Sequence, residues 1–310
     1  MQNRRSFIRQ TLLGSGLLAL HNFPFESLAA IQSQKLTILH TNDVHSRLEP
    51  FPMDGGKFEG QGGVAVRAAL IEKIRKEEQH VLLLDAGDIF QGTPYFNLYK
   101  GEPEIMAMSM MQYDAVTMGN HDFDAGVEGF ARQLPHARFP VLTANYDFTE
   151  TALEGKTQPY AIFKKGALKV GVFGIGIQLK GLVPEDAYGK TKYIEPLQTA
   201  KSVSAHLKKK EKCDLVICLS HLGYSYNFNK VSDMILAKET EYIDLIIGGH
   251  THTFLDQPTV MKNKIGKEIV INQVGWAGLR LGRLDYSFDS KKSSSLVNAQ
   301  SVILTKQTSS

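Results

Sequence analysis

Cysteine is scarce in this chain of 310 residues, which contains only Cys213 and Cys218. The two residues flank one apolar run, and along a strand they would stand about 16 Å apart. A disulfide requires Cα atoms within about 7 Å of each other, so we expect no bridge between them. We interpret Cys218 as a small core residue.

Net charge is also small, at a formal value of +3. Removing residues 1–30 takes away three arginines and one glutamate, which lowers the formal charge from +3 to +1. A nucleic-acid partner normally requires a strong local excess of basic side chains. We therefore expect neither a nucleic acid nor another polyanion as a partner.

The apolar run near the N-terminus, Thr11–Leu20, is well short of the ~20 residues that span a bilayer. It follows the basic residues Arg4 and Arg5 and precedes the small residues of Ser27–Ala30. This order is typical of an export signal, and the arginine pair indicates the twin-arginine route. We predict that residues 1–30 are a signal peptide and that the mature protein is periplasmic or extracellular, without stable membrane insertion. An uncleaved membrane anchor is the alternative.

Short runs rich in Val, Ile and Leu predict buried strands. The runs are Leu36–His40, Val81–Asp85, Ala115–Met118, Pro140–Ala144, Leu168–Ile175, Leu215–Ser220, Ile243–Ile247, Glu268–Gln273 and Leu281–Phe288. Amphipathic patterns predict helices at Gly63–Glu77, Pro103–Met111 and Thr199–Lys210, and Met106, Met108, Met110 and Met111 are expected in a helix core. This alternation indicates an α/β or layered α+β domain over residues 31–289. Residues 290–310 are Ser-rich and are expected to be loosely structured, apart from a short strand at Ser301–Leu304.

Five of the predicted strands end in polar residues of the kinds that bind metals. In chain order the clusters are Asn42-Asp43-Val44-His45, Asp85-Ala86-Gly87-Asp88, Gly119-Asn120-His121-Asp122, Ser220-His221 and Gly249-His250-Thr251-His252. In open α/β sheets, functional sites form beyond the carboxyl ends of strands. Residues two apart in an extended segment project to the same side, so Asp43 and His45 are expected to converge, as are His250 and His252.

Each cluster alone has a structural explanation. Asp-x-His occurs in surface loops, Gly-Asn-His forms ordinary turns, and His221 could be a hydrogen-bonded core histidine. Five such strand ends in one chain favour a metal centre instead. The candidate ligands are four histidines, two aspartates and one asparagine: Asp43, His45, Asp88, Asn120, His221, His250 and His252. Seven ligands suggest two ions that share Asp88, and the mixture suits Mn, Zn, Co, Fe or Ni better than Ca.

These motifs resemble the five-block pattern of the calcineurin-like metallophosphoesterases. The stretches Ile38–His45, Gly87–Pro94 and Gly119–Asp124 resemble more narrowly the N-terminal catalytic domain of the 5′-nucleotidase and UDP-sugar hydrolase family. The resemblance implies a four-layer α/β/β/α sandwich of two mixed sheets with a dimetal centre at the strand ends. It also implies that a water bridging the two ions attacks the phosphorus.

The resemblance assigns a role to each candidate residue. One ion would be held by Asp43, His45, Asp88 and His252, and the other by Asp88, Asn120, His221 and His250. His121 would contact the phosphoryl group as a catalytic residue, and Asp124 would orient its imidazole.

Two differences from the family pattern bear on function. His252 stands where several members have an amide, which affects the identity of the metal. The usual second domain, whose aromatic side chains hold the base, is not recognised in this sequence. We expect an exported hydrolase of phosphate monoesters, with 5′-nucleotides among the candidate substrates. The alternatives are a phosphodiesterase or nucleotide-sugar hydrolase, a sulfur-ester hydrolase, or a catalytic subunit that needs a separate nucleotide-binding chain.

Overall fold

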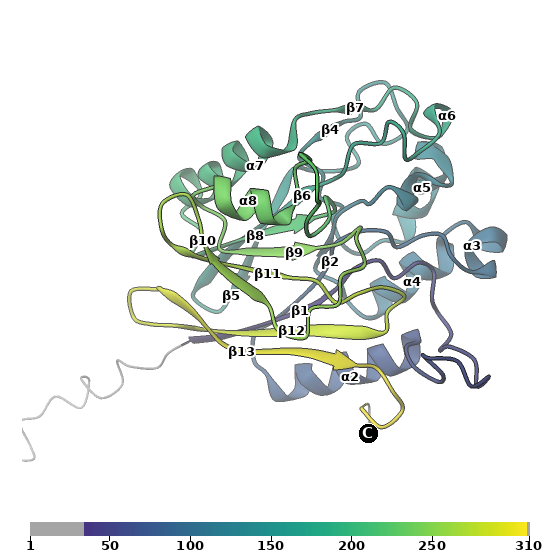
Figure 1. Cartoon of the computed structure of the whole chain (residues 1–310), viewed down its shortest axis with the longest axis horizontal. Helices are drawn as coiled ribbons and strands as arrows, with labels where there is room; N and C mark the ends of the chain where they lie inside the picture. Colours follow the sequence, from purple (N-terminus) through teal and green to yellow (C-terminus); the bar gives the residue numbers. More distant parts are fainter. Residues whose placement is uncertain (1–33, 309–310) are drawn as a thin grey trace, which may run out of the picture.

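The computed structural model describes residues 34–308 as two mixed β-sheets packed face to face (Figure 1). The predicted signal peptide, residues 1–30, lies outside the described residues. Within residues 34–308 no helix is long and apolar enough to cross a membrane.

The first sheet has the strand order β13-β12-β1-β2-β3. Strand β1 pairs parallel with β2 and antiparallel with β12, so the start and the end of the described chain lie in one sheet. The strands are β1 (Gln34–Thr41), β2 (Val81–Asp85), β3 (Ala115–Val116), β12 (Arg280–Phe288) and β13 (Ser294–Ile303).

The second sheet has the order β10-β11-β9-β8-β6-β5 and is built from the middle of the chain. Its four inner strands are parallel, and both edge strands are antiparallel to their neighbours. The strands are β5 (Tyr160–Lys165), β6 (Leu168–Ile175), β8 (Leu215–Ser220), β9 (Leu245–Gly248), β10 (Thr259–Lys262) and β11 (Glu268–Asn272). A separate two-stranded ribbon joins β4 (Tyr146–Asp147) to β7 (Lys192–Tyr193).

Helices cover the outer face of each sheet. On the first sheet they are α2 (Val64–Glu77), α4 (Glu102–Met110) and α5 (Gly126–Gln133), and on the second α7 (Pro196–Ala205) and α8 (Asp233–Glu239). Figure 1 shows α7 and α8 above the second sheet and α2 below the first. The shorter elements are α3 (Pro94–Tyr99), α6 (Glu185–Tyr188), the 3₁₀ turns η2 (His121–Phe123) and η3 (Leu134–His136), and the π-helical turn η4 (His206–Lys210).

Three apolar layers hold the four structural layers together. Ile38 and Leu84 of the first sheet pack against Val172 and Ile217 of the second between the two sheets. The strand residues that point outward pack under the helices, as Leu83 does beneath the helices of the first sheet. This arrangement confirms the α/β/β/α sandwich, and it follows from strands that are apolar on both faces.

Three local predictions were wrong at least in part. The tail was expected to form a strand only at Ser301–Leu304, but strand β13 runs from Ser294 to Ile303 along the edge of β12. Pro140–Ala144 forms only isolated bridges through Val141 and Leu142 rather than a strand. In the methionine cluster, Met108 and Met111 are buried but Met106 and Met110 are exposed. The two cysteines are free, and Cys218 is buried as expected, as is Cys213.

Candidate metal centre

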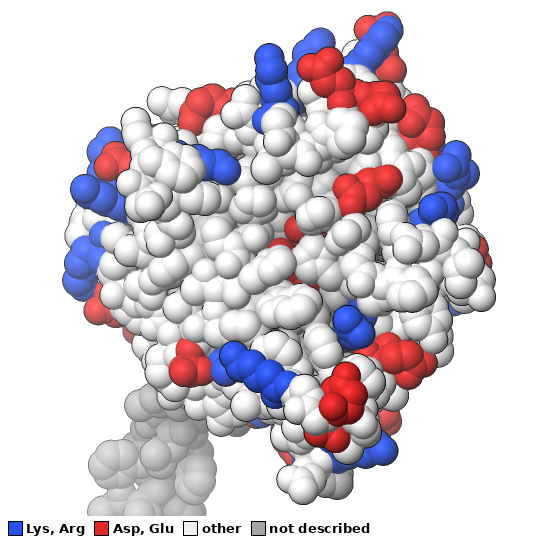
Figure 2. Space-filling model, turned by 45° about the vertical axis from the view of Figure 1, so that its right-hand side comes forward, with Lys and Arg blue, Asp and Glu red and all other residues white. Residues whose placement is uncertain are grey.

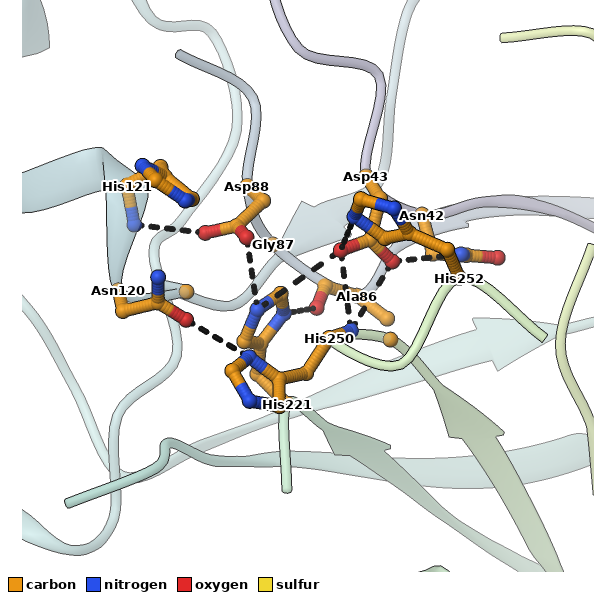
Figure 3. A network of polar contacts seen from close by, with 12 residues as sticks. Asn42, Asp43, Ala86, Gly87, Asp88, Asn120, His121, His221, His250 and His252 are labelled. Atoms are coloured by element: carbon orange, nitrogen blue, oxygen red, sulfur yellow. Dashed lines mark hydrogen bonds and ion pairs between the residues drawn. The ribbon is translucent and has the colours of Figure 1, made fainter. Parts of the chain in front are cut away.

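All seven predicted ligands come together where the two sheets meet, beyond the ends of their strands. Four of them follow β1, β2 and β3 of the first sheet: Asp43, His45, Asp88 and Asn120. The other three follow β8 and β9 of the second sheet: His221, His250 and His252. In Figure 3, Asp88 and His221 lie between the side of the site with Asn120 and His121 and the side with Asp43 and His252.

Two triads of side chains are placed to hold an ion each. They are Asp43 with His45 and His252, and Asp88 with His221 and His250, and the ligand atoms of each triad lie within 4.8 Å of one another. Each triad combines residues from both sheets. This arrangement is consistent with a dinuclear metal site.

The first triad is built around the carboxylate of Asp43. The Nε2 atoms of His45 and His252 lie 3.0 Å apart, and Asp43 Oδ1 lies 3.4 Å from the Nε2 of His252. His45 Nδ1 faces the carbonyl of Phe90 at 3.2 Å, which fixes a proton on Nδ1 and leaves a lone pair on Nε2. A carboxylate and two ring nitrogens that converge in this way suit a divalent cation.

In the second triad, His221 has an orphaned nitrogen. Its Nδ1 donates to the carbonyl of Ala86 at 2.7 Å, an arrangement typical of metal-binding histidines. Its buried Nε2 lies 3.1 Å from Asp88 Oδ2 but makes no hydrogen bond. The amide oxygen of Asn120 lies 2.8 Å from His250 Nδ1 and so borders this triad. The donor set therefore fits a metal ion.

The charge on each residue of the triads depends on its neighbours. Burial acts to lower the pKa of His221, but the carboxylates of Asp88 and Asp43 outweigh burial and raise the pKa to about 10. Burial acts to raise the pKa of Asp88, but positive charge on His221 and His45 holds it below its ordinary value. Burial lowers the pKa of His250 to about 4, and it also lowers the pKa of His45. The two carboxylates thus demand a compensating positive charge, which a metal ion supplies when it displaces protons from its ligands.

The convergence of Asp43 with His45 has a different cause from the one expected. The prediction assumed extended backbone, but both residues have a φ of 49°. His250 and His252 are likewise left-handed, with φ values of 72° and 51°. Spacing in the sequence correctly predicted that Asp43 and His45 would meet. The expected convergence of His250 with His252 was wrong, because the two rings belong to different triads. Spacing also did not predict this backbone conformation.

Gly119 is required because the backbone at this position lies close to two side chains of the centre. A Cβ at this position would overlap the carboxylate of Asp88 and would lie 2.6 Å from His221 Nε2. No other residue leaves room for the two side chains.

His121 and Asp124 form a pair next to the triads. His121 Nδ1 lies 2.9 Å from Asp124 Oδ2, and this hydrogen bond is the first cause of a raised His121 pKa. The His121 backbone N–H donates to Asp88 Oδ1 at 2.8 Å. Its side chain is 37% exposed and its ring lies 5.3 Å from that of His45, so it can meet a ligand that binds at the centre.

Sequence reasoning missed the role of Asp122. This buried carboxylate accepts four backbone N–H groups, from Gly119 and Asp88 on one oxygen and from Ile89 and Phe90 on the other. Burial raises its pKa to about 7, and negative charge on Asp88 adds to that effect. Asp122 thereby fixes the loop after β2 against the loop after β3. The only indication of this role in the sequence was the position of Asp122 inside the Gly119–Asp124 motif.

Asn42 was also quoted without a role. Its Nδ2 donates to Asp43 Oδ2 at 2.7 Å and to the Gly275 carbonyl at 2.6 Å. Its Oδ1 accepts the backbone N–H of Val274 at 2.9 Å. Asn42 therefore orients the Asp43 carboxylate and ties it to the loop between β11 and β12.

A layered sandwich with two mixed Asp/His triads at its strand ends defines a metal-dependent phosphoesterase. Residues 36–254 match the family model of the calcineurin-like phosphoesterases. The chain belongs to this family.

Several known proteins are similar over most of the chain. A snake venom 5′-nucleotidase from Crotalus adamanteus is 34% identical over 90% of this chain and 50% of the relative. A 5′-nucleotidase from Vibrio cholerae is 32% identical over 92% of this chain and 55% of the relative. The crystal structure of a 5′-nucleotidase precursor from Thermus thermophilus superposes with a TM-score of 0.79 and 33% identity, covering 89% of this chain and 55% of that one. The chain thus spans about half the length of the relatives it matches.

Proposed function

We propose that this protein is an exported dimetal phosphoesterase that hydrolyses phosphate monoesters, with 5′-nucleotides among its substrates. The observation that carries the proposal is the pair of adjacent Asp/His triads, with His121 and its partner Asp124 beside them. The relatives named 5′-nucleotidase support a nucleotide as the substrate class.

Each ion would be held by four side chains, with Asp88 common to both sets. The first set adds Asp43, His45 and His252, and the second adds Asn120, His221 and His250. When bound, two such ions supply a water of lowered pKa and positive charge close to the phosphoryl oxygens. The ligands suit Mn, Zn, Co, Fe or Ni, and elemental analysis of the purified protein distinguishes them.

The chain's own contribution to the reaction comes mainly from His121. Asp124 accepts the Nδ1–H of His121 and so fixes the orientation of its ring. The Nε2 atom can then donate to a phosphoryl oxygen or pass a proton to the leaving oxygen. Asp122 and Asn42 act indirectly, because they fix the loops that carry Asp88 and Asp43.

The main test is a substrate panel on metal-reconstituted protein that lacks residues 1–30. We expect turnover of p-nitrophenyl phosphate and AMP, and a loss of at least about 100-fold in Asp88→Asn, because both ions lose a ligand. The matched control is Asp186→Asn, which removes an exposed carboxylate on α6. Equal activity of the Asp88 variant and the wild type would contradict the proposal.

The same panel separates the alternatives. Turnover of bis-substituted phosphates alone would indicate a phosphodiesterase, and turnover of thiosulfate esters alone a sulfur-ester hydrolase. Nucleotide turnover that requires a second chain would indicate a separate nucleotide-binding subunit.

Export by the twin-arginine route is proposed from residues 1–30. Replacing Arg4 and Arg5 together by lysine should keep the precursor inside the cell, because that route recognises the arginine pair. Cell fractionation followed by immunoblotting measures the outcome, and Arg9→Lys is the control for loss of one arginine outside the pair. Normal export of the double variant would exclude this route.

A further inference from the structure

A cavity of about 270 Å³ opens beside the candidate metal centre. One side of the cavity is formed by residues of the centre: His45, His121 and His252. Its other side includes Arg47 and Trp276. A phosphoryl group held at the centre would therefore extend its leaving group into this space.

Three aromatic side chains, Phe51, Phe58 and Trp276, form what we call the aromatic wall. The indole of Trp276 stacks on the ring of His252, with centroids 5.9 Å apart and planes 11° from parallel. Phe51 and Phe58 contact Trp276 in T-shaped geometry at 6.0 and 6.3 Å. The wall continues directly from a metal-binding ring, and aromatic surfaces of this kind favour contact with flat rings.

Backbone hydrogen bonds hold the aromatic wall in place. The N–H of Phe51 donates to the Gln61 carbonyl at 2.9 Å, and the N–H of Gly60 donates to the Phe51 carbonyl at 3.1 Å. Beside Trp276, the N–H of Ala277 donates to the Asp43 carbonyl at 2.7 Å. The conformation of the aromatic wall is therefore fixed in the absence of a ligand, which lowers the entropic cost of binding.

Arg47 provides a second, independent observation. Its guanidinium carbon lies 4.2 Å from the centroid of Phe51. Its Nε atom is buried without a hydrogen-bond partner, and its side chain forms no ion pair with any of residues 34–308. A buried N–H without an acceptor is unfavourable, and guanidinium groups pair best with phosphate and carboxylate. Because Arg47 also lines the cavity, its guanidinium can pair with an anionic group of a ligand bound there.

We propose that Arg47 and the aromatic wall form a leaving-group subsite that selects a flat ring linked to a second anionic group. Given the proposed function, on which this inference rests, the matching substrate class is a nucleoside diphosphate. Its terminal phosphoryl group binds at the centre, its inner phosphate pairs with Arg47, and its base contacts the wall.

The reaction consumes one water, whose oxygen forms the new bond to the terminal phosphorus. The bond from that phosphorus to the bridging oxygen breaks, and the inner phosphate leaves with the bridging oxygen as a nucleoside monophosphate. At neutral pH one proton is released to solvent.

The first experiment uses fluorescence, because Trp276 is the only tryptophan of the chain. Adenosine, a leaving group that cannot be hydrolysed, is titrated into the metal-loaded protein. We expect a saturable change in tryptophan emission with adenosine and none with ribose. An emission that responds equally to both compounds, or to neither, would overturn the subsite.

The second experiment compares kcat/KM for ADP, AMP and glycerol 3-phosphate. In Trp276→Leu, the ratios of both nucleotides to glycerol phosphate should fall about tenfold, and Trp276→Phe should restore most of that loss. In Arg47→Gln, the ratio of ADP to AMP should fall about tenfold, because only ADP presents an inner phosphate. Leu98→Ala, an exposed change on α3, is the control and should leave every ratio unchanged.

The outcomes separate the subsite from the activity. Ratios that stay constant in the Trp276 and Arg47 variants would refute the subsite while leaving the phosphoesterase proposal intact. Failure to hydrolyse any of the three esters would refute the proposed function, and the adenosine titration would still test the subsite.

Discussion

Five residues of the candidate centre adopt left-handed backbone conformations that normally favour glycine. They are Asp43, His45, Asp88, His250 and His252, with φ values between 49° and 72°. Each such conformation costs a non-glycine residue roughly 1–2 kcal/mol. The packed strands that precede these residues must supply that free energy, as is common at functional sites. Residue types predicted which side chains gather at the centre, and spacing predicted the contact of Asp43 with His45 but not the separation of His250 from His252. Strain of this kind leaves no pattern in a single sequence.

Asp122 yields a prediction about stability at this scale. Asp122→Asn should lower the free energy of unfolding by about 3 kcal/mol, because an amide group would face backbone N–H donors that now have a carboxylate acceptor. Urea denaturation measures the change. Asp124→Asn, which alters a partly exposed carboxylate, should change stability by less than about 1 kcal/mol. Equal effects of the two substitutions would show that Asp122 is not the structural link between the loops.

At the scale of elements, the strands with continuous apolar runs were predicted closely. Leu168–Ile175 and Leu215–Ser220 have the expected bounds. Most of strand β13 was missed, and only its end from Ser301 was predicted. It is an edge strand of mostly polar residues, and within residues 34–308 it pairs with β12 alone. Its strand conformation depends on that pairing, so the Ser-rich sequence alone indicated a loose tail.

Leu304, directly after β13, tests how firmly the end of the chain is attached. Its side chain is fully buried in the layer beneath the helices of the first sheet, and its N–H donates to the Leu279 carbonyl at 2.9 Å. Leu304→Ala should lower the free energy of unfolding by about 2–5 kcal/mol. Ile303→Ala, at an exposed neighbouring side chain, should cost much less. Similar costs in denaturant titrations would mean that the tail contributes little to the core.

At the scale of the whole molecule, uncharged surface covers most of the face in Figure 2, and charged side chains gather toward its rim. The two-sheet architecture was predicted through the family resemblance, because periodicity alone cannot assign nine strands to two sheets. The division of each triad between the sheets likewise depends on strand order, which only the structure provides.

His40 links the two sheets and predicts a pH dependence. The ring is fully buried and its Nε2 lies 2.9 Å from Asn272 Nδ2 of β11. Burial lowers its pKa to about 3. Between pH 6.5 and about 3 the unfolded chain therefore binds a proton that the folded protein does not. Stability should fall by about 1.4 kcal/mol per pH unit on acidification through this window, and His40 should have no such effect above it.

The measurement is urea unfolding of the chelator-treated protein from pH 7 to pH 4. His40→Asn should reduce the slope of stability against pH by the contribution of one proton, about 1.4 kcal/mol per pH unit. His136→Asn, which removes an exposed imidazole, is the matched control. If the slope of stability against pH is the same in His40→Asn and in the wild type, groups other than His40 cause the loss of stability in acid.

Because each triad is divided between the two sheets, ions bound there would link one sheet to the other. The affinity of the triads for metal would depend on how the two sheets are aligned. A small shift of one sheet against the other would change the distances between ligand atoms at the strand ends. Leu84 and Ile217 pack between the sheets, and each lies four residues before a candidate ligand, Asp88 and His221 respectively. Substitutions at either position should therefore weaken ion retention before they unfold the protein. Conversely, the metal-loaded protein should lose less stability than the metal-free protein when packing between the sheets is made worse.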